Sequence, residues 1–328
     1  MDSLLVVSMS TIILLCGYTT AMKKLLLTVG NIYIDHNIFG VETGETYQLE
    51  GDQDYIGKGG ERVLGGSAIN VALQASRLGL EVGFIGKTGQ DQGAEEVKSL
   101  LKVSGIKTEL MKAESGLTTS MAVNLVNKNG QFIGIHYGDA SKVLGPADID
   151  LASPLFDLAS GIYFGGTIKQ PVLFAGAANL FAELHNRPIK IFYDPNRFPS
   201  QESDIDRSLL FEQLQFVDGY FPNQKELFQA VAADNLDQAL NLALESGVQF
   251  VALKLGSQGC RVKSRDEDFV VEGKPITPLT TVGAGDCFNA TFMAYYLGGS
   301  TLRECASKAV TASAIKVGQN IWPDEALL

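Results

Sequence analysis

The chain has 328 residues, a net charge of −11 and 45% hydrophobic residues, which is typical of a globular enzyme with one large domain or two small ones. No block of lysine or arginine offers the basic face that a nucleic acid needs, so we expect no nucleic-acid partner. The four cysteines form no C-x-x-C pair and the three histidines lack metal-ligand spacing. We therefore expect a reduced, cytoplasmic protein without a structural metal site.

Residues 1–21 bear on where the fold begins. Leu4 to Cys16 is an apolar run about as long as the core of a signal peptide, but no lysine or arginine precedes it. The run is too short for a confident membrane span. Met22 is a second methionine, followed by a strand-like run. We favour translation from Met22 over a weak export signal, and we assign residues 22–328 to one domain with no membrane partner.

Strand-like apolar runs alternate with helical patterns along the rest of the chain. This alternation predicts βαβ units and a mostly parallel sheet that helices cover on both faces, which is an α/β fold. The predicted elements, in chain order, are the strand Leu25–Val29, the helix Ala68–Leu78, the strand Val82–Ile85, the helix Gly93–Ser104, the strand Ile189–Tyr193, the helix Leu236–Glu245, the strand Phe250–Leu255 and the helix Asp286–Leu297.

Two stretches interrupt this alternation. Residues 32–64 show no helical period, and residues 118–137 contain two strand-like runs joined at Asn127-Lys128-Asn129-Gly130. The Asn-Gly pair is typical of a β-hairpin. These stretches are either surface meanders or one small sheet, and we predict that they form a lid inserted into the single domain.

The segment Thr281-Val282-Gly283-Ala284-Gly285-Asp286 comes directly before a predicted helix. Its small residues leave backbone N–H groups uncovered, and the helix dipole adds positive charge there, which predicts an anion hole. Asp286 stands at the entrance and can accept a proton from a hydroxyl, although a simple helix cap is the alternative. A helix N-terminus stabilises a carboxylate, so we expect an ionised but weak base. Such a base suits phosphoryl transfer.

Two further motifs indicate ligand contacts. Gly65-Gly66 leads into the predicted helix that carries Asn70, and paired glycines let a polar ligand approach the backbone. Lys254, Gly256 and Gly259 form a glycine turn after a predicted strand, at the edge where open α/β sheets bind ligands. Either motif alone is also typical of an ordinary turn.

Two more motifs are weaker. Asn223 and Glu226 are spaced either to hold a hydrated Mg²⁺ near phosphates or simply to begin a helix. Asp194-Pro195-Asn196 follows a predicted strand and is polar. Gly86-Lys87-Thr88 looks like the end of a P-loop, but the first glycine of that motif is missing, so we expect no phosphate role for Lys87.

Taken in order, these motifs resemble the PfkB, or ribokinase-like, family of carbohydrate kinases over residues 25 to about 320. The resemblance implies a three-layer α/β/α sandwich with a small β-sheet lid. It implies transfer of the γ-phosphoryl group of ATP, with Mg²⁺, to a hydroxyl of ribose, fructose or a related sugar. It also implies residue roles: Asp286 as the catalytic base with Gly283, Ala284 and Gly285 as the anion hole; Asp35, Gly65, Gly66 and Asn70 at the sugar; Lys254, Gly256, Gly259 and Asn223 at the nucleotide; and Glu226 at Mg²⁺ through water.

Some questions stay open at this stage. Thr280 stands where the family often has an aspartate that binds a monovalent cation, so the need for such a cation is undecided, and the role of Arg197 is undecided too. A nucleoside kinase is the nearest alternative, with the lid aromatics Phe39, Tyr47 and Phe132 available to stack on a base. A nucleotide-binding protein without catalysis is the second alternative. The family also includes homodimers that meet through the lid.

Overall fold

A computed structural model describes residues 24–42, 51, 54–127, 132–196 and 207–328 of the chain. The predictions for residues 1–21, Tyr47, Arg197 and the Phe132 side chain lie outside the described residues. Among the helices that the structure describes, none is long and apolar enough to cross a membrane.

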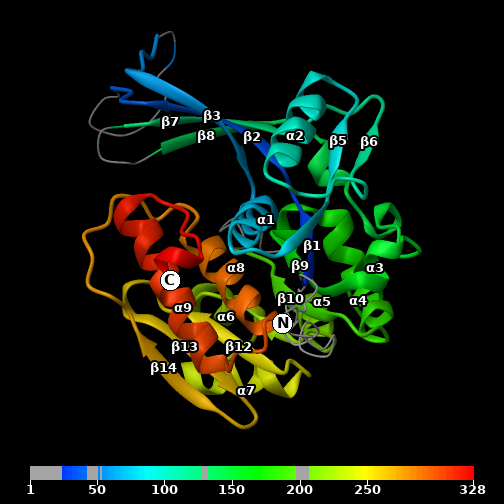
Figure 1. The fold of residues 1–328 in the computed structure, drawn as a ribbon, viewed down its shortest axis with the longest axis vertical. Coiled ribbons are helices and arrows are strands. Elements are labelled where there is room, and N and C mark those ends of the chain that lie inside the picture. The colour runs from blue at the N-terminus through cyan, green and yellow to red at the C-terminus, as the bar shows by residue number, and fades with distance from the viewer. Residues whose placement is uncertain (1–23, 43–50, 52–53, 128–131, 197–206) are drawn as a thin grey trace, which may run out of the picture.

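An eight-stranded sheet forms the middle layer, in the order β14-β13-β12-β11-β10-β9-β1-β4 (Figure 1). The six strands from β12 to β4 are parallel, and β13 and β14 are antiparallel at one edge, which confirms the predicted mostly parallel sheet. All six residues of β1 are buried, as its continuous apolar run predicts for a central strand. The strands are β1 Leu25–Gly30, β4 Glu81–Ile85, β9 Ala159–Gly165, β10 Lys190–Asp194, β11 Gly219–Tyr220, β12 Phe250–Lys254, β13 Gly259–Ser264 and β14 Asp268–Glu272.

Helices cover both faces of this sheet, and each face buries its own apolar core. The three-layer α/β/α sandwich is therefore confirmed. One face carries α3 Pro154–Leu158, α4 Pro171–His185, α5 Arg207–Leu214, α6 Gln224–Ala230 and α7 Leu236–Glu245, and the other carries α1 Ser67–Arg77, α8 Ala284–Leu297 and α9 Leu302–Gln319.

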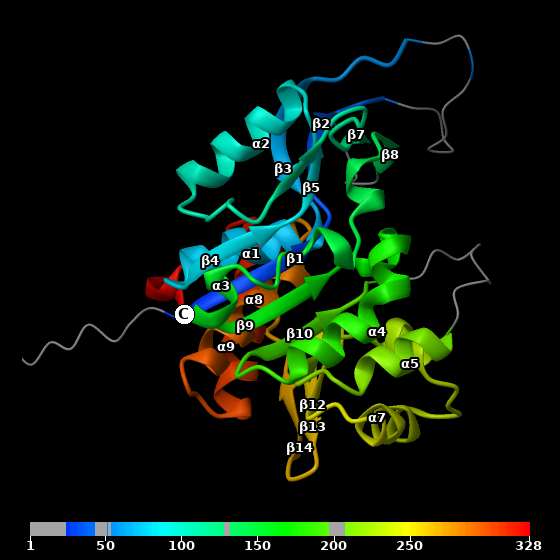
Figure 2. The same ribbon diagram turned by 90° about the vertical axis from the view of Figure 1, so that its right-hand side faces the viewer.

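A separate four-stranded sheet stands beyond one end of the sandwich, with helix α2 (Gln92–Val103) beside it (Figure 2). The separate small sheet is therefore confirmed as part of the fold. Its order is β3-β2-β7-β8, with β2 Tyr33–Phe39, β3 Gly59–Gly65, β7 Met121–Val126 and β8 Phe132–Tyr137. A further two-stranded sheet joins β5 Lys87–Gly89 to β6 Lys112–Glu114.

The register of the small sheet places Asp35 and His136 on one face. Asp35 pairs with Ala122, and Ala122 pairs with His136, so the three side chains share a face. Phe39 lies four residues after Asp35 on β2 and therefore on that same face, where it is 40% exposed. The last residue of β3 is Gly65, and the chain passes from there through Gly66 directly into α1.

Candidate active site

Charged and polar groups meet at the carboxyl ends of the parallel strands. Asp194 ends β10 and Lys254 ends β12, and the Nζ of Lys254 donates to Oδ2 of Asp194 at 2.6 Å. Both side chains are largely buried, with exposed fractions of 15% for Lys254 and 3% for Asp194. Asn223, just after β11, forms an isolated bridge with Lys254. This edge is where open α/β sheets bind their ligands.

Asp286 lies in the first turn of α8 and is held by the neighbouring helix α1. Its Oδ1 accepts a hydrogen bond from Ser67 Oγ at 2.7 Å, and its Oδ2 accepts one from Asn70 Nδ2 at 2.8 Å. The cap of α8 is Gly283, in the left-handed conformation with φ of 76°, so the helix begins at Ala284. The alternative that Asp286 merely caps its own helix is therefore wrong.

A hydrogen-bonded network connects the strand ends to Asp286. Asn289 Nδ2 donates to Asp194 Oδ2 at 2.7 Å and to the Tyr163 hydroxyl at 3.2 Å. The Tyr163 hydroxyl and Ser67 Oγ lie 3.2 Å apart, and Ser67 in turn donates to Asp286. Groups on β9, β10 and α8 are therefore connected to the carboxylate of Asp286 through Ser67.

The pKa of Asp286 lies above the ordinary value of an aspartate. Burial of the carboxyl raises the pKa, and the nearby charge of Asp194 raises it further. Hydrogen bonds from Ser67 and Asn70 and the charge of Lys254 offset this only in part. Desolvation therefore outweighs the hydrogen bonds and the positive charge around this carboxyl, which holds a proton more tightly than an exposed aspartate does.

The turn before α8 presents unpaired backbone donors. The N–H of Ala284 donates to the carbonyl of Thr281 at 3.3 Å, so it is engaged within the turn. The N–H groups of Gly285 and Asp286 donate to no acceptor in the described part of the chain. Lys254 Nζ would lie 3.5 Å from a Cβ placed on Gly285. Two free N–H groups and an ammonium thus converge beside Asp286, which is an arrangement that attracts an anion.

The predicted sugar-binding residues adjoin one another between the two sheets. A Cβ on Gly65 would lie 2.0 Å from Oδ2 of Asp35, so a side chain at this position would have to displace the carboxylate. Burial raises the pKa of Asp35 to about 6, and the charge of Lys169 counteracts this in part. Gly66 caps α1, which carries Asn70 and thereby leads to Asp286.

Asn223 and Glu226 form a reciprocal helix cap at the start of α6. Glu226 Oε2 accepts from the N–H of Asn223 at 2.7 Å, and Asn223 Oδ1 accepts from the N–H of Glu226 at 3.0 Å. Glu226 is 6% exposed, and its charge raises the pKa of Lys254. The two residues therefore border the site while the helix cap holds them in position.

Two hollows open on the surface of the described chain. One, of about 490 Å³, lies between the segment after β14 and helix α9, and is lined by Lys274, Ile276, Thr277, Thr311, Ala314, Ile315, Gly318 and Gln319. The predicted glycine turn of Gly256 and Gly259 adjoins that segment, because Gly273 N donates to Gln258 O at 3.1 Å.

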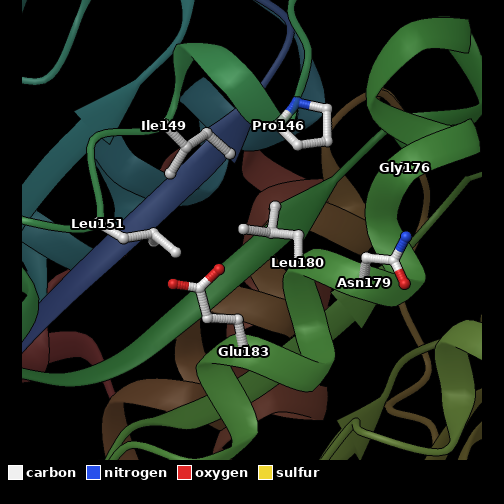
Figure 3. Close-up of a pocket in the computed structure, with 7 residues that line it drawn as sticks. All are labelled: Pro146, Ile149, Leu151, Gly176, Asn179, Leu180 and Glu183. Atoms are coloured by element: carbon white, nitrogen blue, oxygen red, sulfur yellow. The ribbon is translucent and has the colours of Figure 1, made fainter.

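The other hollow, of about 460 Å³, contains none of the predicted site residues. It lies between α4 and residues 146–151 (Figure 3). Its lining includes the apolar side chains of Ile149, Leu151 and Leu180, with Glu183 as the one charged residue.

Sequence reasoning overlooked four members of the network. Ser67 was part of a recognised motif but had no role assigned, and Asp194 was only a weak signal after a strand. Asn289 lies one helical turn after Asp286, so its spacing could have indicated it. Tyr163 gave no signal, because its role depends on β9 packing beneath α1 and α8.

Known proteins resemble this chain in sequence and in fold. A ribokinase from Haemophilus influenzae is 25% identical over 304 residues, covering 90% of this chain and 93% of the relative. A protein described as probable fructokinase-4 from Arabidopsis thaliana is 25% identical over 278 residues, covering 81% of this chain and 80% of the relative. The structure of Arabidopsis thaliana ribokinase with ribose and ATP has a TM-score of 0.73 at 20% identity, covering 94% of this chain and 96% of that one. The model of the pfkB family carbohydrate kinases matches residues 23–320, and the chain therefore belongs to this family of kinases.

Proposed function

We propose that this kinase transfers the γ-phosphoryl group of ATP to a hydroxyl of a small sugar, with Asp286 as the base. The observation that carries the proposal is the position of Asp286. Its carboxylate is fixed by Ser67 and Asn70 directly beside two unpaired N–H groups of α8. A base and an anion hole side by side are what phosphoryl transfer to a hydroxyl requires. The ribokinase and fructokinase names of its relatives support a sugar as the acceptor.

The sugar lies between the small sheet and the start of α1. Asp35 is an acceptor-only group when ionised, and it suits a pair of sugar hydroxyls. Gly65 leaves the space beside it open, because any side chain there would collide with Asp35. The path from Gly65 through Gly66 to Asn70 leads to Asp286, which supports a bound sugar with one hydroxyl next to the base.

The chemical step divides between the base and the anion hole. As the sugar oxygen bonds to the γ-phosphorus, its proton passes to Asp286 and the bond to the β-phosphate oxygen breaks, releasing ADP. The raised pKa of Asp286 makes it a more capable acceptor of that proton. The N–H groups of Gly285 and Asp286, with the ammonium of Lys254, stabilise charge on the transferring group.

The nucleotide occupies the hollow beside α9. Its walls include the apolar side chains of Ile276, Ala314 and Ile315, which suit the faces of a purine ring. Lys274 and Thr277 in its lining belong to the segment that leads to Gly283. A nucleotide bound there would therefore direct its phosphates toward the start of α8. The turn at Gly256 leaves open space for the phosphates, since a Cβ there would meet nothing within 4 Å.

The residues present fit a Mg²⁺ ion that arrives with the nucleotide. Among the described residues, no group of three acidic, histidine or cysteine side chains forms a cage for a metal. Glu226 is held in its helix cap and would reach the ion through water, which Mg²⁺ tolerates because it retains much of its hydration. When bound, the ion neutralises charge on the phosphates of ATP.

A substrate panel tests this proposal. ATP with Mg²⁺ should support phosphorylation of ribose, fructose or a related sugar, measured by ADP release and by mass of the product. Turnover of nucleosides alone would favour the nucleoside kinase alternative. Binding of ATP without transfer to any sugar or nucleoside would overturn the proposal in favour of a non-catalytic nucleotide-binding protein.

A further inference from the structure

Two lysines flank the turn that begins α8. Lys254 Nζ would lie 3.5 Å from a Cβ on Gly285, and Lys316 Cε would lie 3.5 Å from a Cβ on Gly283. Lys254 is paired with Asp194. Lys316 has no carboxylate within 4 Å in the part of the chain that the structure describes. One of the two positive charges at this turn therefore has no carboxylate in direct contact among the described residues.

The ammonium of Lys316 is buried next to Asn320 and Trp322. Lys316 is 5% exposed, and its Nζ donates to Asn320 Oδ1 at 2.5 Å. The same atom lies 5.0 Å from the centroid of the Trp322 ring, a contact that favours a cation. Burial lowers the pKa of Lys316, while the charges of Cys287 and Glu61 act in the opposite direction. A buried ammonium without a paired carboxylate is unfavourable unless an anion comes close to it.

The turn of α9 that carries Lys316 also supports the segment before α8. The carbonyl of Val317 accepts hydrogen bonds from the N–H groups of Leu279 and Thr280, at 2.9 and 3.3 Å. Ser313 Oγ donates to the carbonyl of Ala284 at 3.1 Å. The Trp322 ring would lie 2.9 Å from a Cβ on Gly283. The end of α9 therefore determines the position of the anion hole.

We propose that Lys316 is a positioning residue of the phosphoryl-transfer site, whose buried ammonium fixes the Gly283 turn from behind and adds the positive charge that draws phosphate to α8. This inference rests on the proposed function. It also accounts for Thr280: with the ammonium of Lys316 behind the turn, an aspartate that recruits a monovalent cation is unnecessary. Wild-type activity should accordingly be the same in potassium and sodium buffers.

The substitution Lys316→Met tests the charge while keeping the length and apolar contact of the side chain. We expect kcat to fall about tenfold or more, with the KM of the sugar unchanged and the melting temperature not lowered. The matched control is Lys308→Met on the same helix, whose Nζ donates to the Leu328 carbonyl at 2.6 Å and lies 5.5 Å from the Tyr295 ring. That variant should keep the wild-type kcat. A wild-type kcat in Lys316→Met would overturn the inference.

Chemical rescue separates charge from packing. In Lys316→Ala, ammonium or methylammonium should enter the vacated space and restore part of kcat, whereas sodium should not. A loss of kcat in both Lys316 variants with no rescue, together with a lowered melting temperature, would reduce Lys316 to a packing residue and overturn the inference. If the wild type phosphorylates no acceptor, the proposed function fails separately. Calorimetry then tests the role of Lys316 by comparing the ATP affinity of wild type and Lys316→Met. Equal affinities would contradict that role.

Discussion

Asn70 Nδ2 donates to Oδ2 of Asp286 at 2.8 Å, and this contact joins helix α1 to the first turn of α8. The two residues are 216 positions apart in the chain. Because Gly66 caps α1 and Gly65 lies against Asp35, the same short segment borders both the proposed sugar site and the proposed base. The small sheet is therefore connected to Asp286 through this segment.

The substitution Asn70→Ala should move the pH dependence of kcat. The hydrogen bond from Asn70 lowers the pKa of Asp286, so its loss raises that pKa. Asp286 acts as a base only when ionised, and its activity disappears as the pH falls through its pKa. The acidic limb of the pH–kcat profile should therefore shift to higher pH. Asn186→Ala, an exposed amide on the end of α4 that bonds to Ala182, is the control. An unshifted limb in Asn70→Ala would contradict the role of this contact.

Lys254→Met should lower kcat about a hundredfold, because it removes the ammonium beside Gly285. It should also lower the free energy of unfolding by about 3–5 kcal/mol, since Asp194 is left buried and unpaired. Adding Asp194→Asn should recover most of that stability without recovering kcat. Chemical denaturation and steady-state rates measure the two effects separately.

Lys190→Met is the matched control for that prediction. Lys190 Nζ lies 2.7 Å from Oδ1 of Asp218, but this pair stands at the opposite, amino-terminal edge of the sheet. Its kcat should stay within about twofold of the wild type, as is usual for a change away from the reacting groups. A comparable loss of kcat in both variants would mean that Lys254 acts through general stability only.

Gly65→Ala should raise the KM of the sugar at least about tenfold, because the added methyl group displaces the Asp35 carboxylate. Gly59→Ala, at the other end of β3, adds the same methyl group where nothing lies within 4 Å. That control should retain the wild-type KM. Equal KM values for the two variants would exclude Asp35 from sugar binding.

The raised pKa of Asp35 predicts a second pH effect, on the KM of the sugar. Its pKa of about 6 means that it loses its charge below that pH, so the KM of the sugar should rise as the pH falls through about 6. Asp35→Asn should have a high KM that is independent of pH in this range. Because the folded pKa lies above the ordinary value of 3.8, ionised Asp35 costs stability, and this cost appears as the pH rises through 6. Asp35→Asn should therefore melt no lower than the wild type at pH 8.

Local patterns in the sequence predicted the layers of the fold but not the network of the site. The run at Leu25 and the glycine turns were sufficient to predict buried strands and the polar edge where they end. Helix α9 was not among the predicted elements, because its many small residues give little apolar contrast along the helix. Lys316 and the support that α9 gives to the Gly283 turn were therefore not anticipated.

The raised pKa of Asp286 could not be predicted from the sequence for a similar reason. The dipole of its own helix is visible in the sequence, whereas desolvation by α1 and the charge of Asp194 arise only from packing. The contact of Tyr163 with Asn289 likewise joins residues 126 positions apart. Such contacts depend on how layers meet, which no periodicity in a single segment encodes.

The most direct test of the central claim compares wild type and Asp286→Asn with ATP and the sugar that the panel identifies. The substitution keeps the size of the side chain but removes its capacity to accept a proton. We predict that ATP affinity stays within about threefold while kcat falls at least about a hundredfold, as loss of a positioned general base entails. A kcat for Asp286→Asn close to that of the wild type, with ATP still bound, would contradict the assignment of Asp286 as the base.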